Sequence, residues 1–331
     1  MAAKAPGKSH REGITMPQVA RMFATEESAI KWFESWYWPD GNIVCRKCGS
    51  ADGAYRVKSG KPQPYRCRDC RSYFSLKTGS AMEQSKLPLR LWGWAIYLEM
   101  TALKGVSSMK LHRDLGIRQA TAWFMLHRIR EAFADVRMAF TGPVEVDEAW
   151  FGGKRKSMSN AKRAELKRQG FAQGPKGKQA VVAAKDRETK QVVAKVVDRT
   201  DGATLGGFVD DHVAPDAKLY TDDTSAYKGT DRDRETVKHS AAEYVRYLAG
   251  ETVHTNGVES FWSMLKRAHK GVYHRLSPKH LQRYVDTFAG RQNVREMDTL
   301  AQMQHVVAGM VGRRLMYRDL IADNGRSALA G

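Results

Sequence analysis

Three acidic residues in the second half of the 331-residue chain are spaced so that they could hold divalent cations. Asp147 and Asp222 each follow a short run of apolar and β-branched residues and are predicted to stand at the end of a strand. Glu259 is predicted to lie in the first turn of a helix. Three carboxylates from two strand ends and a helix can hold two Mg²⁺ or Mn²⁺ ions, which activate an attacking oxygen and stabilise the leaving oxygen of a phosphodiester. The pattern predicts a two-metal site for phosphoryl transfer.

Each of these acids also has a structural explanation. Asp147 suits a turn, Asp222 suits a helix cap, and Glu259 suits the acidic position of a capping box. Their order along a strongly basic chain favours the catalytic interpretation. Three neighbouring acids remain alternatives for the same roles, namely Glu145, Glu148 and Asp223.

All the cysteines of the chain fall into two CxxC pairs, which are Cys45 with Cys48 and Cys67 with Cys70. Eighteen residues separate the pairs, a spacing that lets two turns close a tetrahedral Zn²⁺ site with four thiolates. Such a zinc also stabilises a segment too small to bury a core of its own. A thioredoxin-like redox role is the alternative, but the segment lacks the βαβ context of that motif. We therefore expect a zinc ribbon.

A helix-turn-helix pattern follows the ribbon, with Gly116 predicted to end the first helix. The second helix would begin with hydrogen-bonding side chains suited to base edges. The residues predicted to contact DNA here are Arg118, Gln119, Thr121 and, further along, Arg128. An ordinary helical linker with a solvated basic face is the alternative.

The overall charge indicates the class of partner. Lys and Arg number 55 against 36 Asp and Glu, which leaves a net charge of +19 and favours a polyanion such as nucleic acid. Ribosomal proteins and membrane-surface proteins share such a charge, so the activity must be inferred from the motifs. The chain has neither a signal-like segment nor an apolar run of membrane-spanning length, and we expect a cytoplasmic, nucleoid-associated protein without membrane contact.

The surrounding elements predict a mixed α/β domain that begins near residue 142. Runs at 144–146, 180–184, 192–197 and 219–221 are predicted strands. A hairpin turn is expected at 186–190 and a helix at 202–213. This order is compatible with a ribonuclease H-like fold. The expected segments are a tail and helix over 1–40, with 1–12 disordered and the helix over 16–38; the ribbon over 41–80; the helix-turn-helix over 85–140; the catalytic domain over 142–295; and a C-terminal helix and tail over 296–331.

The motifs together resemble a known family. They are the two CxxC pairs, Leu115-Gly116 with Thr121-Ala122-Trp123, Val146-Asp147-Glu148, Thr221-Asp222, and His254-Thr255-Asn256 with the block Glu259 to Lys266. From about residue 15 to 295 the chain resembles the zinc-ribbon DDE transposases of prokaryotic insertion sequences, the ISXO2-like group. The resemblance implies a ribonuclease H-like catalytic domain, magnesium dependence, and transposition by direct transesterification.

The resemblance leaves two candidates for the third motif residue, because some relatives use the asparagine of the last block, here Asn256. We favour Glu259, which follows Asp222 after thirty-six intervening residues. A carboxylate also holds a divalent cation better than an amide does.

The functional hypothesis is that the ribbon and the helix-turn-helix bind the terminal inverted repeats of an element as double-stranded DNA. Lys266 lies two helical turns after Glu259, where it could meet a phosphate. A basic loop is predicted to contact flanking or target DNA through Lys154, Arg155, Lys156, Lys162, Arg163, Lys167 and Arg168, unless it is a solvated insertion. A freed 3′-hydroxyl would then attack target DNA, and a homo-oligomer is expected because an element has two ends.

Two alternatives share these modules. One is a transposase-derived DNA-binding regulator without catalysis, against which the presence of all three acids argues. The other is a ribonuclease H-like nuclease or resolvase, which would hydrolyse DNA but not join it. The two N-terminal binding modules favour sequence-directed transposition over this second alternative.

Overall fold

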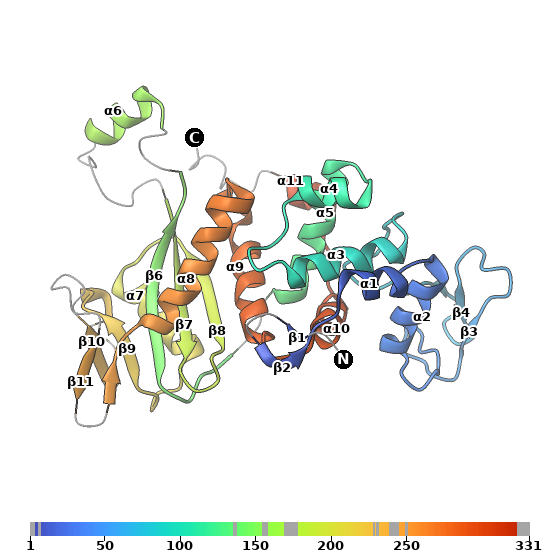
Figure 1. The fold of residues 1–331 in the computed structure, drawn as a ribbon, viewed down its shortest axis with the longest axis horizontal. Helices are drawn as coiled ribbons and strands as arrows, with labels where there is room; N and C mark the ends of the chain where they lie inside the picture. The colour runs from blue at the N-terminus through green and yellow to red at the C-terminus, as the bar shows by residue number, and fades with distance from the viewer. Residues whose placement is uncertain are drawn as a thin grey trace. The chain divides into compact units, whose positions relative to one another are not determined.

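The computed structural model describes residues 4–5, 8–134, 138–153, 158–168, 178–227, 229, 232–237, 245–248 and 251–322. The chain divides into two compact units, each with its own core (Figure 1). Unit 1 combines the chain up to Ala132 with Val294–Ala322, and unit 2 holds Phe133–Asn293.

Unit 2 is built on a five-stranded sheet in the order β10-β9-β6-β7-β8. Its strands are β6 (Val144–Phe151), β7 (Gln179–Asp186), β8 (Val192–Val197), β9 (Leu219–Asp222) and β10 (Arg234–Val237). The first three pair antiparallel, whereas β9 lies parallel to β6 and β10 lies parallel to β9. The expected mixed α/β domain is confirmed, with the hairpin turn between β7 and β8 at the predicted place.

Helices cover both faces of this sheet. Side chains alternate along β6, so that Val144 and Val146 join the core under α7 (Gly202–His212). Ala149 and Phe151 join the opposite core, which α8 (Asn256–Ala268) and α9 (Pro278–Asn293) complete. Figure 1 shows α8 running along the sheet. Asp147 points to the same face of β6 as Ala149 and Phe151, because alternate residues of a strand share a face. The helix α8 packs against this face.

Smaller elements complete unit 2. They are the helix α6 (Asn160–Arg168), the 3-10 turn Ser225–Tyr227, the hairpin of β11 (Arg246–Leu248) and β12 (Glu251–Val253), and a π-helical turn at His269–Tyr273. Of the predicted basic loop, Arg163, Lys167 and Arg168 lie on α6. Lys154, Arg155 and Lys156 lie outside the described residues, as does the side chain of Lys162.

Unit 1 is mostly helical. Its helices are α1 (Met16–Met22), α2 (Glu26–Tyr37), α3 (Leu89–Thr101), α4 (Ser108–Leu115), α5 (Gln119–Arg130), the 3-10 turn Glu131–Phe133 at its border, α10 (Thr299–Gly309) and α11 (Tyr317–Ile321). A three-stranded antiparallel sheet joins β3 (Ala54–Arg56), β4 (Tyr65–Cys67) and β5 (Tyr73–Phe74). None of the helices in the described part of the chain is long and apolar enough to cross a membrane.

The N-terminal region differs from the expectation in two ways. The single helix expected over 16–38 is two helices, because the side chain of Thr25 accepts a hydrogen bond from the Ser28 N–H and starts α2 anew. The disorder expected over 1–12 is wrong for the described residues there. Lys4–Ala5 and Lys8–Glu12 form a two-stranded antiparallel ribbon, and the Glu12 N–H donates to the Asp298 carboxylate.

The C-terminal segment carries the helices α10 and α11, and up to Ala322 it is part of unit 1. The Ala81 N–H donates to the Met310 carbonyl, and the Gly312 N–H donates to the Gly79 carbonyl, both at 2.8 Å. Further along, the rings of Phe124 and Tyr317 meet edge to face. The segment thereby joins the end of the ribbon to the helix α5. The predicted tail from residue 324 lies outside the described residues.

Candidate active site and metal centres

Asp147 and Asp222 lie side by side on the neighbouring parallel strands β6 and β9, just beyond the last pair of their ladder. Asp222 ends β9 as predicted, but the strand end predicted for Asp147 is wrong, because β6 continues to Phe151 in antiparallel pairing with β7. The β6–β9 ladder pairs Val144 with Leu219 and Glu145 with Tyr220, and then stops. Continued by two residues, the same register places Asp147 opposite Asp222. Carboxylate oxygens of Asp147, Asp222 and Glu148 lie within 4.8 Å of one another. Three carboxylates at this spacing can share one divalent cation.

Burial and nearby negative charge make Asp147 and Glu148 costly to ionise. Burial raises the pKa of Asp147 to about 6, and the charges of Asp222 and Glu259 add to the effect. Burial also raises the pKa of Glu148 to about 7, with Asp147 and Asp222 as further causes. The Tyr227 hydroxyl donates a hydrogen bond to Glu148. A bound cation would relieve this repulsion, so the donor set fits a hard divalent metal.

Glu259 stands in the first turn of α8, as predicted, but outside the cluster of Asp147, Glu148 and Asp222. Its Oε1 accepts a hydrogen bond from the Thr255 hydroxyl at 3.2 Å. One turn further along the same helical face, the indole N–H of Trp262 donates to Asp147 Oδ2 at 3.0 Å. This face of α8 is therefore directed toward the two aspartates.

The remaining candidates on α8 are more exposed. Asn256 is the exposed first residue of the helix, and Lys266 is exposed two turns after Glu259. Among the alternative acids, Asp223 is exposed beside Asp222.

Glu145, the other alternative acid, ties β6 to the start of α8. Its carboxylate is buried and accepts hydrogen bonds from the Val258 N–H at 2.8 Å and from Arg187 Nε at 3.0 Å. Arg187 also donates to the carbonyls of Thr252 and His254 just before the helix. Gly257 allows this close approach, because a Cβ there would lie 2.6 Å from Glu145 Oε2. These contacts occupy Glu145 in holding the helix that carries Glu259.

Three residues of this site were not singled out from the sequence, namely Trp262, Tyr227 and Arg187. Trp262 had a signal, because it lies three residues after Glu259 and so on the same helical face. No sequence pattern pointed to Arg187. It lies 42 positions after Glu145, and the carbonyls that accept its other hydrogen bonds lie on a third segment of the chain.

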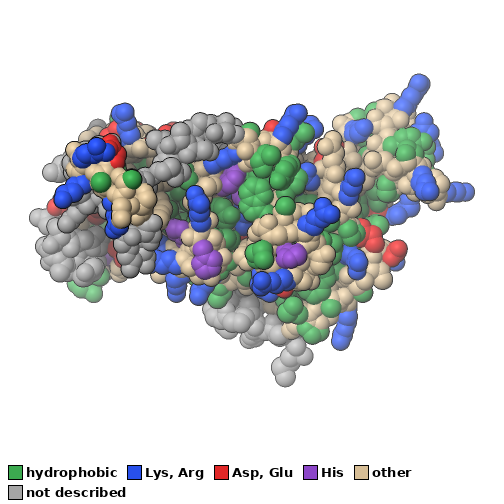
Figure 2. All heavy atoms as spheres, turned by 90° about the horizontal axis from the view of Figure 1, so that it is seen from above, with side chains coloured by type: hydrophobic (Ala, Val, Ile, Leu, Met, Phe, Trp, Pro, Cys, Tyr) green, Lys and Arg blue, Asp and Glu red, His purple; other side chains and the backbone are tan. Residues whose placement is uncertain are grey.

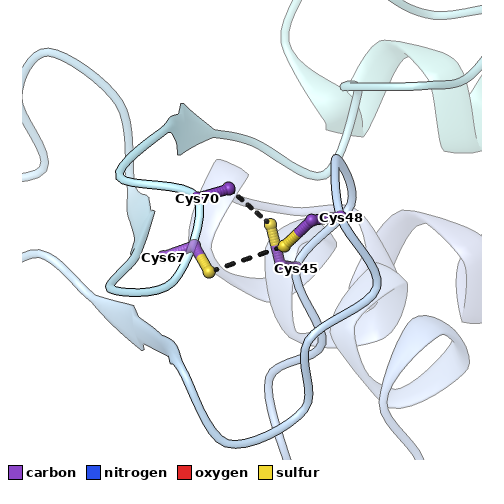
Figure 3. A group of neighbouring side chains, drawn as sticks. All are labelled: Cys45, Cys48, Cys67 and Cys70. Atoms are coloured by element: carbon purple, nitrogen blue, oxygen red, sulfur yellow. Dashed lines mark hydrogen bonds between the residues drawn. The ribbon is translucent and has the colours of Figure 1, made fainter.

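The four cysteines form a second centre (Figure 3). Cys45 and Cys70 bring their sulfur atoms to 3.7 Å, and Cys48 and Cys67 do the same. A tetrahedron with Zn–S bonds of about 2.3 Å requires sulfurs about 3.8 Å apart. A disulfide would need about 2.05 Å. The cluster therefore fits Zn²⁺, and a zinc ribbon is the structure that the spacing predicted.

The two turns that carry the cysteines share a backbone conformation. The residue after the second cysteine of each pair has a positive φ, 78° at Gly49 and 56° at Arg71. In the second turn, the backbone N–H of Ser72 lowers the pKa of Cys70 to about 6. Such turns direct N–H groups toward sulfur, which favours the thiolate that zinc binds.

Two helices, α4 and α5, flank Gly116, which has φ 64° and ends the first of them as predicted. Arg118 and Gln119 are exposed, Thr121 is half-buried, and Gln119 Nε2 donates to Ser108 Oγ at 2.8 Å. Arg128 is half-buried, and its Nε donates to the Leu315 carbonyl.

Arg130, at the end of α5, lies in the core of the unit and does not face solvent. Its side chain is 1% exposed, and Nη2 lies 3.8 Å from Glu99 Oε1 inside the unit. The second oxygen of Glu99 accepts the Val106 N–H at 3.2 Å, so this pair connects α3, α5 and the turn before α4.

Comparison with known proteins agrees with both centres. Residues 139–293 match the ISXO2-like transposase domain, and residues 24–72 match the transposase zinc-ribbon domain. The chain is also 28% identical over 289 residues to an uncharacterized protein in transposable element ISH50 of Halobacterium salinarum. That alignment covers 83% of this chain and 93% of the relative. The cysteine cluster lies inside one matched domain and the acidic cluster inside the other, so the chain combines a transposase zinc-ribbon domain with an ISXO2-like transposase domain.

Proposed function

We propose that the protein is a transposase that binds the ends of its element and catalyses metal-dependent DNA cleavage and strand transfer. The observation that carries the proposal is the pair Asp147 and Asp222 on the neighbouring parallel strands β6 and β9, just beyond the last pair of the β6–β9 ladder, with the Glu259 face of α8 directed toward them. The sheet order, with three antiparallel and two parallel strands, supports a ribonuclease H-like fold for unit 2.

Asp147, Asp222 and Glu259 would hold the Mg²⁺ or Mn²⁺ ions. Two such ions would activate the attacking oxygen and stabilise the leaving oxygen of an in-line displacement. Trp262 keeps Asp147 in place through the indole hydrogen bond. Glu148 brings a third carboxylate into the cluster, and its bond to Tyr227 fixes its direction. Lys266, exposed on the same helix, would contact a DNA phosphate.

DNA recognition is assigned to unit 1, with α4 and α5 acting as a helix-turn-helix. Arg118 and Gln119 at the start of α5 are exposed and suited to base edges, whereas Arg128 has part of its guanidinium engaged with Leu315. The ribbon would add phosphate contacts. Because an element has two ends, at least two copies of the chain would assemble on DNA.

The test is a strand-transfer assay with Mg²⁺ or Mn²⁺, a target plasmid, and oligonucleotides that carry the inverted repeats flanking the gene. We expect joined products from the wild type and none from Asp147→Ala, Asp222→Ala or Glu259→Ala. Asn256→Ala separates the two candidates for the third residue: loss with Asn256→Ala and retention with Glu259→Ala would transfer the role to the asparagine.

The same assay distinguishes the alternatives. Cleavage without joining would identify a nuclease or resolvase. Specific binding of the ends without any cleavage would identify a regulator.

A further inference from the structure

The small sheet of the ribbon has an unusual outward face. The register pairs Tyr55 with Arg66 across β3 and β4, and Arg66 with Tyr73 across β4 and β5. These three residues form one row across the strands, and each is partly exposed. The row therefore presents two aromatic rings with a guanidinium between them.

The opposite face of the same sheet is a core face. Tyr65 and Phe74 are buried and stacked with their ring centroids 5.4 Å apart, and Trp38 packs edge-on against Tyr65. Cys67 anchors this face to the zinc site. The row of Tyr55, Arg66 and Tyr73 lies on the face of the sheet opposite to this core.

The cations of the outward face rest on aromatic rings and are not neutralised by acids. Arg66 lies over the ring of Tyr73 at 5.1 Å, and Arg68 lies over the ring of Tyr55 at 5.2 Å. Arg56, in contrast, forms an ion pair with Glu34. No carboxylate among the described residues pairs with Arg66 or Arg68.

The surroundings reinforce this positive charge. Residues 41–80 contain nine Lys and Arg against two acids, and one of those acids, Asp69, accepts a hydrogen bond from Ser50. In the space-filling view, Lys and Arg side chains project around hydrophobic ones at the right-hand end, which holds the ribbon (Figure 2).

We propose that this face is a stacking site for unpaired bases of DNA, such as overhanging or frayed nucleotides beside the bound duplex. Aromatic rings and guanidinium planes stack on bases, and uncompensated cations attract the backbone. Stacked bases inside a duplex expose only their edges, so a row of two rings with a guanidinium between them matches unpaired bases better. The inference rests on the proposed function in one respect, namely that the ribbon contacts DNA.

The test uses the full-length, zinc-loaded protein and fluorescent duplexes with either blunt ends or an oligothymidine overhang. We expect tighter binding of the overhang duplex by the wild type. Tyr55→Leu and Tyr73→Leu should each weaken overhang binding by about five- to 100-fold while leaving blunt-duplex binding unchanged. The phenylalanine variants, which keep the ring, should bind like the wild type.

The salt dependence of DNA binding distinguishes the contribution of charge from that of stacking. The slope of the logarithm of the binding constant against the logarithm of the salt concentration should be the same in the leucine variants as in the wild type. In Arg66→Ala this slope should be shallower by about one. Tyr247→Leu is the matched control, because Tyr247 is an exposed tyrosine (80% exposed) outside the ribbon. One zinc per chain in each variant shows that the ribbon is still folded.

A second measurement needs no variant. A 2-aminopurine placed in the overhang should change its fluorescence on binding if it stacks on the protein. An unchanged signal, or leucine variants that bind the overhang like the wild type, would overturn the proposal. If blunt duplexes still bind in that case, the proposed function stands. If the wild type binds neither duplex, the result counts against the proposed function itself.

Discussion

Asp147 is a residue whose charge opposes folding. Burial raises its pKa from 3.8 to about 6, so the ionised form costs free energy in the folded state. This cost is absent below about pH 4, grows between about pH 4 and 6, and is complete above the folded pKa, where it amounts to roughly 3 kcal/mol. We therefore predict that Asp147→Asn abolishes strand transfer yet stabilises the magnesium-free protein at pH 8, with little gain at pH 4.

Thermal unfolding at both pH values, with zinc retained, measures this difference. Added Mn²⁺ should stabilise the wild type and not the variant, because the variant lacks the charge that the cation compensates. An asparagine variant less stable than the wild type at pH 8 would contradict the burial argument.

Cys48 allows the contribution of zinc to be measured separately from packing, because it is the exposed member of the cysteine cluster. Its replacement by serine removes one thiolate without opening a cavity. We predict that Cys48→Ser lowers the zinc content from about one ion per chain to near none and unfolds the ribbon. Zinc analysis and amide exchange over residues 41–80 test this. If the ribbon is still protected from exchange without zinc, its aromatic core alone is sufficient to keep it folded.

At the scale of elements, the start of α8 depends on Glu145. Removing this carboxylate leaves Arg187 and the Val258 N–H without their buried acceptor. We predict that Glu145→Ala lowers the free energy of unfolding by about 3 kcal/mol. Mn²⁺ binding should also weaken, because the helix that carries Glu259 loses its connection to β6.

The matched control for this prediction is Glu188→Ala, an exposed acid in the neighbouring turn that should change stability by less than about 0.5 kcal/mol. A double-mutant comparison tests the positional argument. If Glu145 acts on the metal through Glu259, Glu145→Ala should weaken Mn²⁺ binding no further in a Glu259→Ala background. Additive losses would show that Glu145 affects the site by another route.

At the scale of the whole molecule, the cysteine cluster and the acidic cluster lie in different compact units, each with its own core. We predict that calorimetry resolves two unfolding transitions. Cys48→Ser should shift only the transition of unit 1, and Asp147→Asn only that of unit 2. The double variant should show the sum of both shifts, since distant sites with no shared partner are additive. A single transition shifted by either substitution would indicate that the units unfold together.

The sequence by itself determined the features that depend on local spacing. The two CxxC pairs define a zinc site because each pair is closed by one turn of chain. The alternation in the strands and the glycine between α4 and α5 likewise act over a few residues. Asp147 and Asp222 were predicted because each follows a short run of strand-forming residues, although β6 continues past Asp147, and their approach follows from the pairing of neighbouring parallel strands.

Only the tertiary structure decided which side chains meet across distant segments. It placed Glu148 in the acidic cluster, assigned Glu145 to the start of α8, and buried Arg130 against Glu99. It also joined the C-terminal segment to unit 1. Local periodicity carries no information on these contacts, because burial and partner depend on how elements far apart in the chain pack together.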